Sequence, residues 1–265
     1  MTVPASGVRA LLDSEQTRRA SDRQIMTLAE VMGARVNIQR DNSPSGRSDV
    51  NAAEEPRLSG KDMDLFFDSS NRNATDQNLA RLCTLLKERR DIKLRCVHLG
   101  PSAITNAGLK NFEGLFVQQL GIRNTAVNGD ELADDLSGFR VNEWGTVPEL
   151  SQAGLLKFLA ADNVQSIDIS VDLLSPELMS ALDGSHLPAL GLLGPAKNGW
   201  PPHDVFKALS DSPVRKIQFV GPNLPESYLK TLHREMPHLA LGQGGERSCT
   251  SRQRKGSRCG PQDRW

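Results

Sequence analysis

Apolar side chains recur along the middle of the chain with one fixed spacing. Starting at Leu94, further apolar residues follow 3, 5, 10 and 15 positions later. Three more segments, beginning at Val117, Val164 and Val214, repeat this spacing without a gap. Less regular copies lie between them, and we place the second apolar position of successive units at residues 65, 97, 120, 139, 167, 190, 217 and 239. The mean step of about 25 residues predicts a repeat protein whose units stack side by side.

Each copy has the composition of a strand, a turn and a helix. The first apolar positions alternate with polar ones, which predicts a short strand with one buried face. A turn rich in Gly, Pro or Asn follows, such as GPSA from Gly100 or RNTA from Arg123. A helical run then begins at a residue that can cap it, as in TNAGLKNFEGLF from Thr105 and SQAGLLKFLAAD from Ser151. The sequence therefore predicts an α/β protein of repeated strand and helix layers.

One stretch of the array resembles a known family. The string LRCVHLGPSAITNAGL, residues 94–109, and its continuation LGIRNTAVNGDEL, residues 120–132, are similar to the ribonuclease-inhibitor-like leucine-rich repeats common in bacterial, notably planctomycete-type, proteins. VMGARVNI at 31–38 is similar to the segment that often precedes such arrays. The resemblance implies a horseshoe-shaped solenoid with a parallel β-sheet on its concave face and helices on its convex face. It implies little about function.

The chain departs from this family at the start of its helices. The family's repeated Asp is replaced, in successive units, by Asn106, Gly129, Gln152, Pro176 and Glu226, and no asparagine ladder follows the turns. We therefore expect an irregular array whose turns are held by other hydrogen bonds.

The chain divides into four parts by composition. Residues 1–39 are expected to form a helical cap and a possible first strand, because Ile25, Leu28 and Met32 share one helical stripe within 14–33 and Val36 and Ile38 alternate. Residues 40–61 are polar and predict a loose connector. The solenoid of about seven to eight units is expected at 62–241, followed by a basic disordered tail at 242–265. Such a tail would leave the last strand, near residues 239–241, as an uncapped edge.

Charge and hydropathy narrow the function classes. With 32 Lys and Arg against 32 Asp and Glu, the net charge is zero, so no overall field favours nucleic acid or an anionic membrane. We expect nucleic acid to bind only weakly, through the basic tail. The N-terminus lacks the apolar core of a signal peptide, and no segment is apolar enough to span a membrane. We expect a cytoplasmic protein, with Cys83 and Cys96 as reduced structural thiols.

Candidate chemistry is sparse. His233, Glu235 and His238 form the one dense cluster of possible metal ligands, but they cross a helix end and a proline, so their side chains should diverge. GPAKNG at 194–199 lacks the residue order of a phosphate-binding loop. No catalytic serine, zinc-protease or calcium-loop motif is present. We expect a protein that is not an enzyme and has no cofactor and no metal.

Binding residues are expected on the sheet's concave face. The positions between or just beyond the buried residues of each strand should point outward there. Two of the less regular copies contain an inserted loop, and Trp144 and Trp200 each lie in one of these loops. Each tryptophan either fills the core or serves as an exposed aromatic anchor. The outward residues of mixed polarity and charge are His98, Arg123, Arg140, Asn142, Asp168 and Gln218.

Mixed charge favours a protein surface as the partner, since a phosphate backbone would require several Lys or Arg together. The sequence therefore favours a non-catalytic protein–protein interaction module. An alternative is a substrate-recognition adaptor or effector subunit of an enzyme system, for example a ubiquitin-ligase-like one. A truncated or non-expressed reading frame is a third interpretation.

Overall fold

The protein is an α/β structure with one open, mostly parallel sheet. The computed structural model describes residues 5–39, 58, 61–67, 72–194, 203–207, 209, 212–220 and 224–244. Within these residues, nine strands follow one another in the order of the chain, from β1 to β9. The chain forms two compact units, Met1–Asn128 with Ser137–Val141, and Gly129–Leu136 with Asn142–Trp265.

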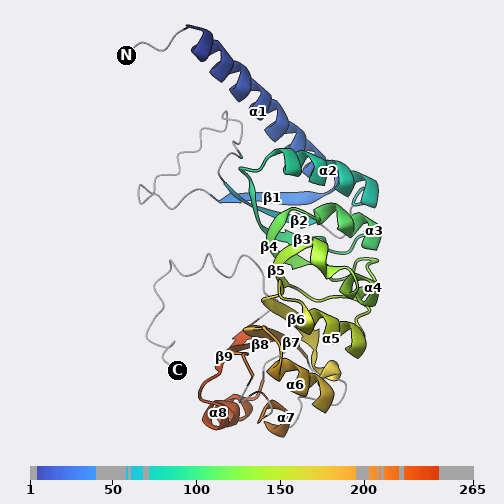
Figure 1. Cartoon of the computed structure of the whole chain (residues 1–265), viewed down its shortest axis with the longest axis vertical. Helices are drawn as coiled ribbons and strands as arrows, with labels where there is room; N and C mark the ends of the chain where they lie inside the picture. The colour runs from blue at the N-terminus through green and yellow to red at the C-terminus, as the bar shows by residue number, and fades with distance from the viewer. Residues whose placement is uncertain are drawn as a thin grey trace. The chain divides into compact units, whose positions relative to one another are not determined.

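The first unit carries the N-terminal helix and the strands β1 to β4. β1 pairs antiparallel with β2, whereas β2, β3 and β4 are parallel. Figure 1 shows α2 and α3 on the same side of β2, β3 and β4. The elements are α1 (Ala5–Val31), β1 (Ala34–Gln39), β2 (Asp62–Phe67), α2 (Asp76–Glu88), β3 (Lys93–His98), α3 (Asn106–Leu109), the 3-10 turn η1 (Lys110–Phe112) and β4 (Phe116–Gly121).

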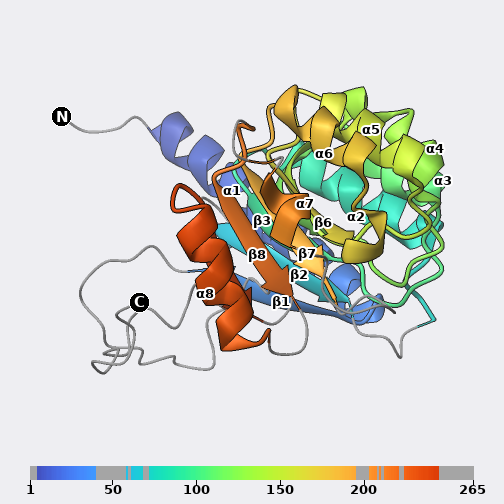
Figure 2. The ribbon, with the colours of Figure 1, turned by 90° about the horizontal axis from the view of Figure 1, so that it is seen from below.

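The second unit continues the alternation of strands and helices. Its strands β5 to β9 pair in parallel, each with the next along the chain. Figure 2 shows α5 and α6 on the same side of β6 and β7. The elements are α4 (Gly129–Ala133), η2 (Leu136–Gly138) and β5 (Arg140–Trp144), which both contribute residues to the two units, then α5 (Gln152–Ala160), β6 (Ser166–Ser170), η3 (Val171–Leu173), α6 (Pro176–Asp183), β7 (Ala189–Leu193), α7 (His203–Lys207), β8 (Lys216–Val220), α8 (Glu226–Glu235) and β9 (Ala240–Gly244).

The repeat spacing is explained by how the strands align. In the first unit, Leu65, Val97 and Leu120 are register partners and are fully buried. In the second unit, Ile167, Leu190 and Ile217 align in the same way. Each strand therefore adds one layer to a common core, so no single layer can bury its apolar face alone.

The strand pairing corrects the predicted register at two places. Trp144 aligns with Ile167, so β5 contributes Trp144 as its second buried position, and Phe139 is not that residue. Leu241, rather than Leu239, aligns with Ile217. The first error has a physical cause, because a search for aliphatic residues and Phe passes over a tryptophan that fills the same core position.

Helix starts are held by hydrogen bonds from the preceding repeat, as the departures from the family pattern predicted. The Asp76 carboxylate accepts from the Thr105 backbone N–H (2.9 Å) and from the Thr105 hydroxyl (2.6 Å). Gly108 leaves room for it, since a Cβ there would lie 2.0 Å from Asp76 Oδ1. One repeat later, Asn106 Oδ1 accepts from Asn128 N–H (2.7 Å), and its amide donates to the Asn128 carbonyl (2.9 Å).

The second unit uses the same device with different side chains. Asp130 accepts from the Ser151 N–H (2.8 Å), and the Gln152 amide donates to the Ser175 hydroxyl (2.7 Å). Ser151 and Ser175 in turn cap α5 and α6. The Asp130 bond and the two serine caps satisfy backbone donors that a helix cannot satisfy internally.

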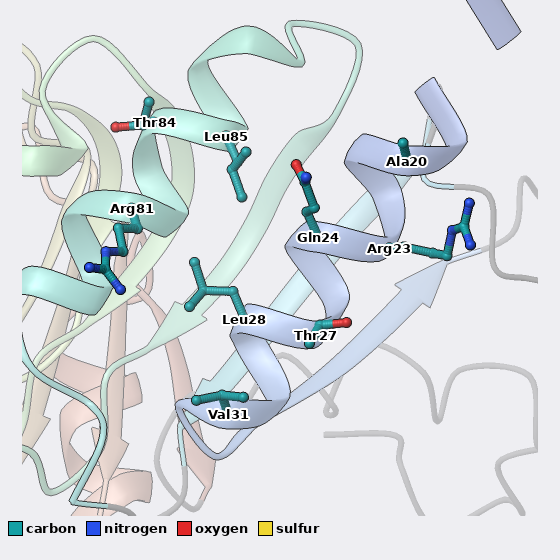
Figure 3. Close-up of a pocket in the computed structure, with 9 residues that line it drawn as sticks. All are labelled: Ala20, Arg23, Gln24, Thr27, Leu28, Val31, Arg81, Thr84 and Leu85. Carbon is teal, nitrogen blue, oxygen red and sulfur yellow. The ribbon is translucent and has the colours of Figure 1, made fainter. Parts of the chain in front are cut away.

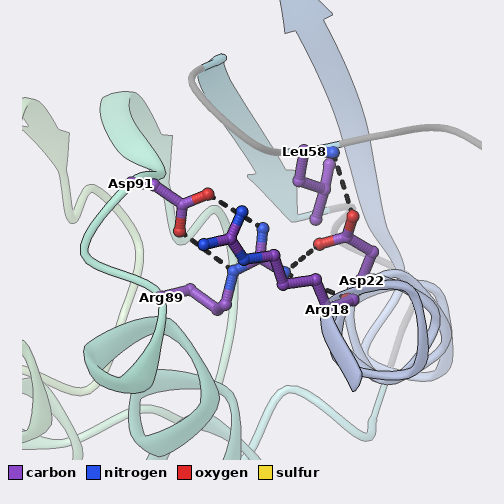
Figure 4. A network of polar contacts seen from close by, with 5 residues as sticks. All are labelled: Arg18, Asp22, Leu58, Arg89 and Asp91. Carbon is purple, nitrogen blue, oxygen red and sulfur yellow. Dashed lines mark hydrogen bonds and ion pairs between the residues drawn. The ribbon is translucent and has the colours of Figure 1, made fainter. Parts of the chain in front are cut away.

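The N-terminal helix is longer than predicted and is fixed at one point by buried charge. It begins at Ala5 rather than near residue 14, and Ile25 and Met32 are buried as expected. Figure 4 shows the Arg89 guanidinium between Asp22 of α1 and Asp91. Asp22 also accepts from the Leu58 N–H (3.2 Å), and Leu58 is fully buried. The predicted loose connector is therefore anchored at Leu58.

The remaining predictions concern undescribed segments, the cysteines and the first strand. Trp200, residues 40–57 and 59–60 of the predicted connector and the chain beyond Gly244 lie outside the described residues. The predicted tail begins too early, because residues 242–244 belong to β9. Cys83 is a free thiol whose burial raises its pKa to about 12. Cys96 takes part in a disulfide, so the expectation of a reduced thiol holds for Cys83 only. The predicted first strand exists as β1, and it is antiparallel.

Candidate functional site

In the first unit, His98 belongs to a row of residues on the sheet face opposite the buried one. Phe66, His98 and Gly121 are register partners across β2, β3 and β4. The Phe66 and His98 rings stack with centroids 5.4 Å apart and planes 12° apart. A Cβ at Gly121 would lie 2.3 Å from His98 Nδ1, so the glycine makes room for the imidazole.

The environment of His98 favours its neutral form. Burial lowers the pKa of the imidazole, and the negative charge of Asp64 opposes this shift. His98 Nε2 is buried and has no hydrogen-bond partner among the described residues. The ring therefore contributes mainly an aromatic surface, which stacks on Phe66.

An ion pair that the sequence pattern did not indicate lies beside this row. The pairing of β2 with β3 shifts between Met63 and Asp64, which leaves Arg95 as an extra residue in β3. Arg95 Nε donates to Asp64 Oδ1 (2.9 Å), and the second guanidinium nitrogen pairs with Oδ2. A register shift cannot be read from apolar spacing. The charged Asp64 within the apolar segment DMDLFF was the available signal.

In the second unit, Asp168 and Gln218 share a row with two glycines. Asp168, Gly191, Gln218 and Gly242 align across β6, β7, β8 and β9. Asp168 is buried and Gln218 is half-buried. The glycines leave a low strip beside these two polar side chains, on which a protein backbone could approach closely.

The corrected register moves two predicted residues away from the middle of the face. Glu143 pairs with Ser166, two residues before Asp168, and Asn142 lies one residue further back, where its backbone carbonyl accepts from the Gln165 N–H (2.8 Å). Arg140 lies at the first residue of β5, and its guanidinium carbon is 6.0 Å from the centroid of the Phe116 ring. Arg123 follows β4 in an exposed turn.

Trp144 belongs to the core. It is 1% exposed, and its ring makes an edge-to-face contact with Phe158 at 5.5 Å. Of the two interpretations of this residue, core filling is therefore the one that the structure supports, and Trp144 is not an exposed anchor.

A shallow cleft of about 730 Å³ lies between α1 and α2 (Figure 3). Leu28 and Leu85 point into the space between the helices, whereas Arg23 points away from it. Its lining is largely apolar, with Gln24, Arg81 and Thr84 among the polar residues at its border. We assign it no role in recognition.

Across the described residues, no three His, Cys, Asp or Glu side chains gather closely enough to hold a metal ion, and His233, Glu235 and His238 are all exposed. Within the same part of the chain, none of the helices combines the length and the apolar character of a membrane span. No protein-family model matches the sequence, and no curated protein is significantly similar to it.

Proposed function

We propose that this chain is a leucine-rich-repeat protein of the ribonuclease-inhibitor-like kind, in which parallel strands line the concave face of a horseshoe. We further propose that it binds another protein through that face and performs no catalysis. The proposal covers both compact units, each of which contributes one row of outward side chains.

One observation carries this proposal, namely the contrast between the two sets of register positions. Buried positions keep one chemistry, as in Leu65, Val97 and Leu120. Outward positions on the same strands change at every step, as in the row of Phe66, His98 and Gly121. A scaffold with constant inner residues and variable outer ones presents a surface whose specificity lies in scattered side chains.

The outward rows also have the mixed character of a protein interface. In the first unit they combine the stacked Phe66 and His98 rings with Gly121, beside the Asp64–Arg95 ion pair. The second unit adds Asp168 and Gln218. Interfaces between proteins join aromatic and arginine anchors to polar groups in this way, whereas a nucleic-acid surface would be dominated by cations.

Site-specific photo-crosslinking in cells tests the proposal. A photoreactive phenylalanine analogue would replace Gln218 or Arg123 on the proposed face, and Lys157 or Lys230 on the helices as matched exposed controls. We expect discrete crosslinked protein adducts from the first pair that the second pair does not give. Adducts from the helix positions alone, or none from any position, would reject the concave face as the binding surface.

A second step connects the adduct to specific side chains. Reversing one charge with Arg123→Glu should remove the Gln218 adduct if one partner covers both positions, because a misplaced charge at an interface costs several kcal/mol. Lys157→Glu provides the control for the charge change itself. An adduct that survives Arg123→Glu and is lost with Lys157→Glu would contradict the proposal.

A further inference from the structure

A second surface of the first unit has a different chemistry. A cleft of about 580 Å³ lies at the edge where β3 and β4 begin. Lys87 and Arg90 contribute to it from the end of α2 and the turn that follows, Lys93 from the start of β3, and Arg140 from the start of β5. Among the described residues that line it, Glu113 is the one acidic side chain. We call this surface the basic cleft.

The four cations are available for a ligand. Lys87, Arg90, Lys93 and Arg140 are all exposed, and no ion pair or hydrogen bond engages their side chains within the described part of the chain. Arg89, which also lines the cleft, differs from them, because it is already paired with two aspartates. The positive charge of the cleft is therefore not neutralised by the protein itself.

An aromatic residue fixes the position of one of these cations. Phe116 is 45% exposed, which is unusual for so large an apolar side chain in this structure. The Arg140 guanidinium lies over its ring at 6.0 Å. A cation–π contact restricts the guanidinium and leaves its N–H groups free to bond a planar anion with two hydrogen bonds.

The cleft is a consequence of the repeat. Lys93, Phe116 and Arg140 each precede the first buried residue of their strand, and the two buried residues Leu94 and Val117 are register partners. Neighbouring strands are about 4.8 Å apart, so equivalent positions in successive repeats form a short row. Residues distant in the sequence are thereby gathered into one charged edge.

We infer that the basic cleft binds an acidic segment of a protein partner, with carboxylates bonded by Arg140 and Lys93. This inference rests on the proposed protein-binding function and adds a second contact, separate from the concave face. The cleft volume lies within the range of about 300–1,000 Å³ that is usual for ligand sites, enough for a few side chains. An apolar ligand would leave the four cations desolvated without partners.

Nucleic acid fits the basic cleft less well. Its phosphates would require a track of cations, and here they are confined to one pocket that also contains Glu113. Bases would need an open aromatic platform, and Arg140 already covers the Phe116 ring. The formal net charge of the whole chain is zero, so no long-range attraction for a polyanion adds to the local one.

Fluorescence anisotropy with defined probes tests this inference on the full chain. The probe is a fluorescein-labelled decapeptide of alternating Glu and Gly, and the same peptide with Gln in place of Glu is its neutral control. We expect saturable binding of the Glu peptide alone. In the double variant Lys93→Gln/Arg140→Gln the dissociation constant should rise about tenfold or more, because two charge-assisted contacts are removed.

Two further variants separate site from charge. Lys157→Gln/Lys230→Gln removes the same charge from exposed helix positions and should leave the affinity unchanged. Arg140→Lys keeps the charge but loses the planar fork, so its dissociation constant should lie between those of the wild type and the double variant. Circular dichroism verifies that each variant is folded.

Three results would overturn the inference. One is the absence of saturable binding to the Glu peptide. Another is an equal loss of affinity in Lys157→Gln/Lys230→Gln, which would indicate unspecific charge. The third is tighter binding of a ten-nucleotide oligo-dT that is lost in Lys93→Gln/Arg140→Gln, which would identify nucleic acid as the ligand. Crosslinking from Gln218 is independent of all three, so a failed cleft and a failed concave face are distinguishable.

Discussion

The buried pair of Asp22 and Arg89 gives the sharpest prediction about stability. Both side chains are 7% exposed. The guanidinium pairs with Asp22, donates to the Arg18 carbonyl (3.2 Å) and makes two bonds to Asp91 (3.0 and 3.1 Å). The Asp91 hydrogen bonds, together with those of Asp22 and both charges, raise the pKa of Arg89 against the effect of burial, so Arg89 stays charged.

Removing one member of this network should be costly. Breaking a buried pair costs about 3–5 kcal/mol when the remaining charge has no partner. Asp22→Ala leaves Arg89 with Asp91, which lowers the cost, and leaves the buried Leu58 N–H without its acceptor, which adds about 1–3 kcal/mol. We therefore expect the free energy of unfolding to fall by about 3 kcal/mol.

Urea denaturation of single and double variants measures this loss. The double variant Asp22→Leu/Arg89→Met should recover much of it, since well-packed apolar residues often replace a buried pair without loss. Asp134→Ala is the matched control, because its ion pair with Lys157 is exposed (64% and 50%) and should contribute less than about 1 kcal/mol.

Hydrogen exchange locates the effect within the fold. In Asp22→Ala the amides of α1 and β1 should exchange faster than those of β3 and β4, because Asp22 joins α1 to the rest of its unit. If Asp22→Ala destabilises no more than Asp134→Ala, the network does not hold the N-terminal helix and the reasoning fails.

Three further predictions concern single positions. Gly100→Ala should lower the free energy of unfolding by more than about 2 kcal/mol in urea or thermal unfolding, because Gly100 has φ +54° and a Cβ would lie 2.4 Å from the Phe67 carbonyl oxygen. Gly114→Ala is the control: Gly114 has φ +78° and open space around it, so the loss should be only about 1 kcal/mol. Equal losses in the two variants would contradict the steric argument. Burial lowers the pKa of His98, so as the pH falls the unfolded chain binds a proton near pH 6.5, before the folded chain does. The free energy of unfolding should therefore decrease below that pH, by at most about 1.4 kcal/mol per pH unit, until the pKa of the folded protein is passed. His98→Gln should remove this component from unfolding curves recorded between pH 5 and 7.5, and an unchanged slope would show that another group is responsible. Cys83 should resist iodoacetamide at pH 8 in the folded protein, because the thiol is buried and its pKa is raised to about 12. It should react in urea, as measured by peptide mass. Rapid labelling without urea would refute its burial.

Much of the strand pattern could be predicted from the sequence, because aliphatic residues at regular spacing mark the buried face directly. Val97, Leu120, Ile167 and Ile217 lie where the spacing placed them. Prediction failed where a core position held Trp144, a residue type that the apolar pattern did not include. That single error also displaced Arg140 and Asn142.

Contacts between repeats could not be read in the same way. The Asp76–Thr105 bond spans 29 residues, and its geometry depends on the small size of Gly108. The Asp64–Arg95 pair depends on a register shift. The basic cleft could be predicted in part, because Lys93 and Arg140 occupy equivalent positions of their repeats and a correct register would have grouped them.

The hydrogen bonds between successive helix starts limit how this chain can be rearranged by evolution or by protein engineering. Asp76 requires a threonine and a glycine in the repeat that follows, and Asn106 requires a backbone amide and carbonyl at matching positions. Exchanging, duplicating or deleting a single repeat would join side chains that do not match. A repeat of this protein should therefore be exchangeable only together with its neighbour, and a designed consensus version would have to adopt one of these hydrogen-bonded joints throughout.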